Sequence, residues 1–333
     1  MKVAVLSTVA WRTPPLHYGP WEQMASNLTE GLVEAGLEVT LFATGSSVTA
    51  ATLNSVVEKG YEEDRHQDAK VIECLHISNL MEHAGEFDLI HNHFDFLPLS
   101  YTGLIKTPFV TTIHGFSSER IIPVYQKYNA SSHYVSISNA NRHPLLNYTG
   151  TVYNGLDIGN FDFSNTAGEY LLFFGRIHPD KGTAEAIQIA IKSKRKLIIA
   201  GIIQDENYYR EKVEPFLDEQ IVFIGSAGPE KRNKLLGEAL ALLHPINFEE
   251  PFGLSVAEAQ LCGTPVIAFS KGSMPELIAD KKTGFLVNTI DEATAAVDML
   301  KELNRQECRD WAASKFSKEK MVKDYLAIYH QIL

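Results

Sequence analysis

Short apolar runs rich in β-forming residues alternate with helical patterns along the whole chain of 333 residues. This order favours parallel sheets covered by helices. Several runs are almost continuously apolar, as expected for strands that are buried on both faces. A helix is predicted over residues 20–35, where Met24, Leu28 and Leu32 share one face. In the first half we predict strands at residues 2–8, 38–44, 71–75, 87–91, 109–113 and 134–138.

The pattern stops between residues 160 and 169, which are rich in turn formers, and then starts again. In the second half we predict strands at residues 170–175, 196–200, 221–225, 239–244, 265–269 and 285–288. The final stretch, 318–333, has the apolar face of a helix. We therefore predict an α/β protein of two Rossmann-like domains whose parallel sheets face a central cleft. The N-terminal domain covers residues 1–160, with helix 318–333 packing back on it, and the C-terminal domain covers residues 161–317.

Charge limits the class of partner that this chain can bind. Its formal net charge is −11, and residues 1–160 contain 9 Lys or Arg against 16 Asp or Glu. No broad basic face is expected, which argues against nucleic acid and against strong membrane association. No apolar run is long enough for a transmembrane helix or a signal peptide. The three cysteines, Cys74, Cys262 and Cys308, are far apart, so we expect a reducing cytoplasm rather than a disulfide framework.

Residues 245–259 carry the pattern most suggestive of a ligand site. A strand ends in polar residues, and a Pro-Phe-Gly turn then leads into a helix near Leu254. Gly253 lets the backbone approach a ligand closely, and the first turn of the helix offers free N–H groups to a phosphate. Glu250 and Glu258 could hold two hydroxyl-bearing parts of one ligand. The alternative is that both glutamates are solvent-facing helix charges.

Two cations follow the first strand of the second half. Arg176 and Lys181 flank a turn there, and together they could hold a phosphate group. The alternative is a pair of surface cations near a helix start. The chain has no Asp-x-Asp sequence, a common metal-chelating pair of carboxylates. We therefore expect side chains to supply the positive charge, with no metal and no cofactor.

These motifs resemble retaining glycosyltransferase family 4, whose fold is GT-B. Glu250 and Glu258 match the family's two glutamates separated by seven residues. Further segments match the family in its usual order, and the resemblance covers nearly the whole chain. They are Val152–Asp157, Gly175–Gly182, Gly263–Ala268, Met274–Ile278 and Thr283–Val287.

The resemblance implies a metal-independent transfer of a hexose from a nucleotide diphosphate-sugar, with UDP-glucose expected from its frequency in the family. The diphosphate is then expected near Arg176 and Lys181, the ribose at Glu258 and the sugar at Glu250. The donor is expected to lie under Phe252, Gly253 and Leu254, with its base near Ile224 and Gly225.

In the first half the family resemblance implies a sugar contact from His114, in Thr112-Ile113-His114-Gly115. Gly19 belongs to a segment similar to the family's glycine-rich loop, although Pro20 replaces the second glycine there. A zinc site made by His91, His93 and His114 is the alternative. We expect no such site, because the two neighbouring histidines are expected to point to opposite faces of their strand.

Other functions were weighed against the same residues. A nicotinamide dehydrogenase needs glycines after its first strand, and residues 6–10 contain none. A nonhydrolysing nucleotide-sugar epimerase of the same fold and a non-catalytic nucleotide-sugar-binding module remain as alternatives. For the transferase we expect a soluble acceptor, a small molecule or a glycan. A set of polar and aromatic side chains is expected to line its cleft: Trp11, His17, Trp21, His93 and Asp95.

Overall fold

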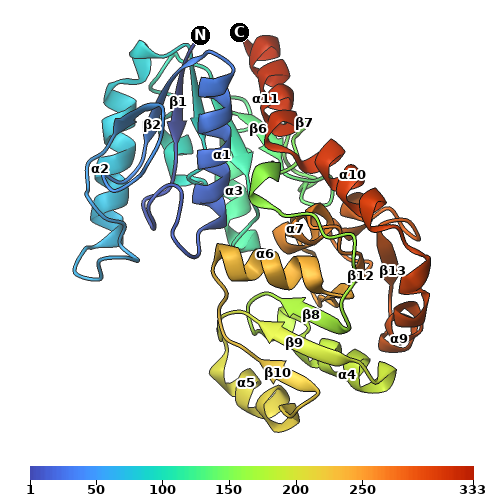
Figure 1. Ribbon diagram of the computed structural model, residues 1–333. Coiled ribbons are helices and arrows are strands. Elements are labelled where there is room, and N and C mark those ends of the chain that lie inside the picture. Colours follow the sequence, from blue (N-terminus) through green and yellow to red (C-terminus); the bar gives the residue numbers. More distant parts are fainter. The chain divides into compact units, whose positions relative to one another are not determined.

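A computed structural model describes residues 1–333, and the chain divides into two compact units. Unit 1 comprises Met1–Gly155 together with Lys318–Leu333, and unit 2 comprises Leu156–Ser317 (Figure 1). The first division falls at Gly155 rather than in the turn-rich stretch 160–169. That stretch belongs to unit 2 because its backbone is hydrogen-bonded there. Ser164 N–H donates to the carbonyl of Cys262, and Gly168 N–H donates to the carbonyl of Glu238.

Unit 1 is built on a seven-stranded parallel sheet in the order β3-β2-β1-β4-β5-β6-β7. The change of direction at β1 leaves the loops after β1 and β4 side by side at the carboxyl edge, where α/β sheets place ligands. The strands are β1 (Lys2–Leu6), β2 (Glu38–Phe42), β3 (Thr52–Asn54), β4 (Leu89–Asn92), β5 (Phe109–Ile113), β6 (His133–Ser136) and β7 (Tyr148–Thr151).

Three elements of unit 1 differ from the sequence prediction. Residues 71–75 lie in helix α2 (Ala69–Glu82) and not in a strand, because Asp68 caps the helix and accepts from the N–H groups of Lys70 and Val71. Val71 and Leu75, which suggested a strand, face solvent there, whereas Ile72 packs against the core. The two edge strands β3 and β7 were not predicted, because they are short and only half-buried and therefore carry no apolar run.

Helix α11 (Lys318–Ile332) packs beside α1 (Pro20–Glu34) on unit 1, as Figure 1 shows. Gly31 allows this contact, because a Cβ at that position would collide with Val322. Lys318 also donates to Glu34 at 2.8 Å. The closing helix is therefore part of the apolar core around β1, to which its Met321 and Tyr325 contribute. The remaining α-helix of unit 1 is α3 (Ile122–Lys127).

Unit 2 repeats the architecture with a six-stranded parallel sheet in the order β10-β9-β8-β11-β12-β13, which confirms the prediction of two parallel-sheet α/β units. The change of direction lies between β8 and β11. The strands are β8 (Tyr170–Phe174), β9 (Lys196–Ala200), β10 (Ile221–Phe223), β11 (Ala241–His244), β12 (Val266–Phe269) and β13 (Gly284–Val287). The helices are α4 (Thr183–Ser193), α5 (Glu206–Lys212), α6 (Pro229–Glu238), α7 (Leu254–Leu261), α8 (Met274–Leu277), α9 (Ile290–Met299) and α10 (Arg305–Phe316).

Candidate functional site

The loops that follow β8 and β11 are locked together at the carboxyl edge of the unit 2 sheet. Asn247 N–H donates to the carbonyl of Asp180 at 2.7 Å. Gly182 has a φ of +74°, and a Cβ there would collide with the carbonyl oxygen of Pro245. Only glycine therefore allows the two loops to touch, and this contact brings Lys181 next to the segment that carries Glu250.

Lys181 and Glu250 form an ion pair in this contact, although they are far apart in the sequence. Their side chains are only 14% and 12% exposed, and the Lys181 ammonium lies 4.5 Å from the centroid of the Phe248 ring. His244, which the sequence did not suggest as a site residue, lies at the end of β11 with Nε2 3.8 Å from the Glu250 carboxylate. Burial, assisted by the charge of Lys181, lowers the pKa of His244 to about 3, so it is neutral at pH 7.

The backbone around Glu250 is held by the turn before α8. Ser273 N–H donates to the carbonyl of Glu250 at 3.0 Å, and the Ser273 hydroxyl donates to the carbonyl of Phe252. Phe252 is buried and packs edge-to-face on Phe316. Gly253 then adopts a φ of +94°, and helix α7 begins at Leu254. The N–H groups of Leu254 and Ser255 have no backbone acceptor, whereas those of Val256 and Ala257 donate to Gly253, so the first two suit an anion.

Glu258 lies one turn into α7 and is buried, where its carboxylate pairs with Arg232 of α6 at 3.1 Å. Burial raises the pKa of Glu258, while the Arg232 charge opposes that shift. The alternative that Glu250 and Glu258 are solvent-facing helix charges is therefore wrong. Each glutamate is largely buried against a cation. Arg232 was not predicted as a site residue because the sequence around it is highly charged and suggests a solvent-exposed helix.

Arg176 and the turn after β10 also lie at the carboxyl edge of the unit 2 sheet, but neither is part of the Lys181–Glu250 ion pair. Arg176 donates to the side-chain oxygen of Gln204, and no hydrogen bond or ion pair connects it to Lys181 or Glu250. Gly225 has a φ of +71° with open space where a Cβ would lie. Ile224 N–H donates to Ile199, and the Gly225 carbonyl accepts from Gly201, so this turn continues the edge of β9. The structure thus brings Lys181 and Glu250 together, while Arg176, earlier in the same loop as Lys181, bonds to Gln204 instead.

In unit 1, three histidines form a buried stack at the carboxyl edge of the sheet. The rings of His91 and His93 stack with centroids 4.4 Å apart, and His93 Nδ1 lies 2.9 Å from His114 Nε2. The expectation that the first two point to opposite faces was wrong, since residues two apart along a strand share a face. Burial lowers the pKa of His91 and of His114 to about 3 and that of His93 well below its usual value. Neither these histidines nor any other group of three His, Cys, Asp or Glu side chains is arranged so that it could hold a metal ion.

Two tyrosines of helix α11 are hydrogen-bonded to a residue of this stack and to one of the neighbouring strand β5. Tyr329 is hydrogen-bonded to His91 Nδ1, and Tyr325 is hydrogen-bonded to the hydroxyl of Thr112 at 2.7 Å. That hydroxyl also lies 2.7 Å from His91 Nε2. Both nitrogens of His91 are therefore satisfied inside the protein, and the C-terminal helix holds a polar network that reaches the edge of the sheet.

Beside the stack, unit 1 contains a cavity of about 420 Å³. Trp21 links the two, because it lines the cavity and stacks on His114 at 5.5 Å. Gly19, with a φ of +150°, lines the same cavity. Of the side chains expected to line an acceptor cleft, Trp11, Trp21 and Asp95 line this cavity, whereas His17 and His93 do not. Glu22 and Glu73 also line it and were not predicted, because nothing in their local sequence marks them.

The carboxylates of this cavity are poorly solvated. Burial raises the pKa of Glu22, of Glu73 and of Asp95, the last to about 6, even though Tyr125 donates a hydrogen bond to Asp95. No Lys or Arg lines the cavity. Its walls are completed by aromatic rings, so the cavity combines apolar faces with hydrogen-bond acceptors.

The pKa of Asp95 makes a prediction about stability. Folding raises this pKa from 3.8 to about 6, so the stabilisation from holding the proton is complete below about pH 4 and is lost as the pH rises through about 6. Asp95→Asn removes the charge and keeps an oxygen for Tyr125. We expect the variant to gain melting temperature over the wild type at pH 8 and to gain less at pH 4, measured by thermal unfolding. A difference that does not change with pH would contradict this assignment.

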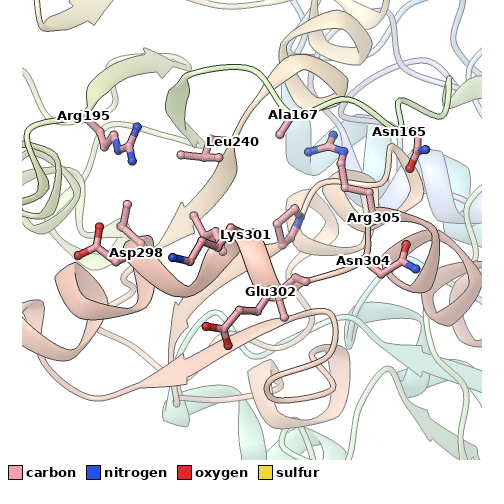
Figure 2. A pocket seen from close by; sticks show the side chains of 13 residues that line it. Asn165, Ala167, Arg195, Leu240, Asp298, Lys301, Glu302, Asn304 and Arg305 are labelled. Atoms are coloured by element: carbon pink, nitrogen blue, oxygen red, sulfur yellow. The ribbon is translucent and has the colours of Figure 1, made fainter.

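A larger cavity, of about 850 Å³, lies elsewhere in unit 2, against the amino ends of the strands (Figure 2). Its most buried charge is Arg305, whose three nitrogens all donate: together they bind three carbonyl oxygens and the Thr264 hydroxyl. This cavity therefore contains a structural arginine that ties loops together. None of the site residues predicted from the sequence lines it.

Comparisons with known proteins place the whole chain in a family. The family model "Glycosyl transferases group 1" matches residues 160–319, and "Glycosyltransferase Family 4" matches residues 22–159. An uncharacterized 41.2 kDa protein from the cps region of Klebsiella pneumoniae is 34% identical over 48% of this chain and 45% of its own length. A D-inositol 3-phosphate glycosyltransferase of Segniliparus rotundus is 24% identical over 100% of this chain and 89% of its own.

Solved structures share the fold. Anabaena HepE in complex with UDP-glucose superposes with a TM-score of 0.73 and 18% identity, covering 99% of this chain and 100% of that one. No helix here is long and apolar enough to cross a membrane. The two family models together match the chain from the start of α1 to the start of α11, and the sheets have the two-unit parallel architecture of their fold. The chain therefore belongs to the family 4, or group 1, glycosyltransferases and has the GT-B fold.

Proposed function

We propose that this glycosyltransferase moves a hexose from UDP-glucose to an unphosphorylated glycan or small-molecule acceptor, with retention of the anomeric configuration. The observation that carries the donor proposal is the buried pairing of Lys181 with Glu250 beside the free N-terminal end of α7. A cation and a helix N-terminus at one edge suit a diphosphate. HepE, of the same fold, was solved with UDP-glucose, which supports this choice of donor.

The residues then have distinct roles. Lys181 and Arg176 balance the charge that develops on the departing diphosphate, and the first N–H groups of α7 bind its oxygens. Glu250 accepts hydrogen bonds from the transferred sugar, and Glu258 does so from the ribose. The base binds at Ile224 and Gly225, where the backbone is open. The departing phosphate takes the proton of the acceptor hydroxyl, which attacks from the same face.

A panel of UDP-, GDP- and ADP-glucose tests the donor by thermal unfolding. We expect stabilisation by UDP-glucose first, and a ligand at 100 times its dissociation constant adds about 2.7 kcal/mol. Product analysis by NMR then separates the possible functions: retained configuration on a new acceptor supports the proposal. Release of UDP with an epimerised sugar would indicate the epimerase alternative. Tight binding without turnover on any acceptor would indicate a binding module.

We expect transfer to proceed without a divalent metal, because Lys181 and Arg176 supply positive charge and the chain has no Asp-x-Asp sequence. Turnover should be the same with excess EDTA and after addition of Mg²⁺ or Mn²⁺. Loss of activity in EDTA that metal restores would contradict the expectation. A known metal-dependent transferase assayed in parallel shows that the chelation is complete.

We propose that the acceptor binds in the 420 Å³ cavity of unit 1. That cavity has three poorly solvated carboxylates and no Lys or Arg, so a phosphate placed there would meet only like charge. The relative from Segniliparus rotundus is named for a phosphorylated inositol. Because the cavity of this chain is lined by carboxylates, we expect its acceptor to differ from that one. Uncharged sugars should therefore accept hexose, whereas inositol 3-phosphate should neither accept it nor compete.

The same charge argument predicts weak binding to anionic membranes, because each nearby Lys or Arg contributes only about 1 kcal/mol and unit 1 is acidic. Co-sedimentation with vesicles rich in phosphatidylserine, at low salt, measures this. Strong binding that is lost on adding salt would overturn the proposal in favour of a lipid-linked acceptor.

A further inference from the structure

His93 is buried between two other imidazoles and yet has one ring nitrogen with no partner. It is 1% exposed, and its Nδ1 lies 2.9 Å from His114 Nε2. Its Nε2 is buried and makes no hydrogen bond within the protein. His91 stacks on one side of it and Trp21 stacks on His114, so the planes of these rings are held by their neighbours.

The hydrogen bond between His93 Nδ1 and His114 Nε2 contains one proton, so one ring donates it and the other accepts it. If His114 donated from Nε2, then His93 would accept at Nδ1 and a neutral His93 would carry its proton on Nε2. That proton would be a buried N–H without an acceptor, an arrangement that is rare and costly in folded proteins. If His93 donates from Nδ1 instead, only a lone pair is left without a partner. The second arrangement is therefore the stable one.

The direction of this bond decides what His114 offers to a substrate. Because His114 Nε2 accepts from His93, a neutral His114 carries its own proton on Nδ1. No protein group is hydrogen-bonded to that nitrogen. We infer that His93 is a positioning residue, which fixes His114 as a hydrogen-bond donor, through Nδ1–H, to an oxygen of the sugar substrate. This inference rests on the proposed glycosyl transfer and names a residue that the family motif did not include.

The burial of the rings supports a neutral pair. Burial lowers the pKa of both His93 and His114 far below 7, so neither ring gains a second proton under ordinary conditions. The groups that face them are the third histidine, the Trp21 ring and the hydroxyl network of Thr112, Tyr325 and Tyr329, none of which is charged at pH 7. His114 is thus a donor of fixed direction and not a general acid.

Two-bond ¹H–¹⁵N correlation spectra of the ¹⁵N-histidine-labelled full chain test the tautomers without any assay of activity. Spectra of His93→Asn and His114→Asn identify the two rings. We expect the unprotonated nitrogen, recognised by its downfield ¹⁵N shift, to be Nε2 in both His93 and His114. A proton on Nε2 of His114 would overturn the inference, whether or not the chain transfers sugar.

A matched pair of variants tests the consequence for catalysis. In His93→Asn the side-chain amide nitrogen takes the place of Nδ1 and can still donate to His114, whereas in His93→Gln it lies near the position of Nε2. We expect His93→Asn to keep near wild-type kcat and His93→Gln to lose on the order of 10- to 100-fold, by analogy with side chains that orient metal-binding histidines. The KM for the donor should change little in either.

Failure of this inference can be told apart from failure of the proposed function. Thermal unfolding identifies a variant that does not fold, and in that case the tautomers in the wild-type spectra are the test of the inference. Equal loss of kcat in two folded variants, or no loss in either, would show that His93 has only a packing role. If the wild type transfers no sugar, the proposed function fails while the spectra still report the direction of the bond.

Discussion

Lys181→Ala is expected to lower turnover by about 10²- to 10³-fold, as when one preorganised donor to a developing anion is removed. It should also destabilise unit 2, because Glu250 would be left largely buried without its cation. We expect a cost of about 3 kcal/mol, the low end for breaking a buried ion pair, since both side chains keep some exposure. Steady-state kinetics and urea unfolding measure the two losses separately.

The double variant Lys181→Ala/Glu250→Gln separates these effects. It removes the unpaired charge, so we expect it to recover most of the stability while turnover stays low. Arg176→Ala should lose turnover to a similar degree with little change in stability, because Arg176 is outside the ion pair and bonds only to Gln204. Lys192→Ala, at an exposed ion pair of the same unit, is the control and should behave as wild type. Near-wild-type turnover in both Lys181→Ala and Arg176→Ala would refute their assignment to the diphosphate.

Glu258→Gln and Glu250→Gln are expected to fail in different ways. A ribose contact is much the same in the ground and transition states, so Glu258→Gln should weaken donor binding by about 10- to 100-fold, the value of a charged hydrogen bond, and should spare kcat. Glu250→Gln should reduce kcat more than affinity, because in the proposed complex Glu250 binds the transferred sugar next to Lys181. Calorimetry with UDP-glucose and kinetics on the same preparations give the two quantities.

The reverse order of effects would mean that the roles of the two glutamates are exchanged. Glu238→Gln provides the control, since that side chain is exposed at the end of α6 and contacts no site residue. Glu258→Gln also leaves Arg232 without its partner, so its melting temperature has to be recorded beside the affinity. An affinity loss with an unchanged melting temperature points to the ribose contact itself.

The sequence by itself was sufficient for the repeated parallel architecture, because strands buried on both faces need continuous apolar runs that any reading can find. It also located the turn into α7, since Gly253 and the polar residues before it are local features of the chain. Prediction from the sequence failed where the hydrophobicity of a segment did not match the place of that segment in the fold. The run 71–75 became a helix through the cap at Asp68, and the half-buried edge strands carried no apolar signal.

Only the tertiary structure decided how the site residues are paired. Lys181 and Glu250 pair between two loops, and Arg232 and Glu258 pair between helices α6 and α7. His244 lies beside Glu250 because β11 ends there. The direction of the bond between His93 and His114 depends on one buried nitrogen having no partner. Periodicity records which face of an element is buried, but a pairing depends on which loops the sheet order brings together. That order is a property of the whole fold and is not written in any one segment.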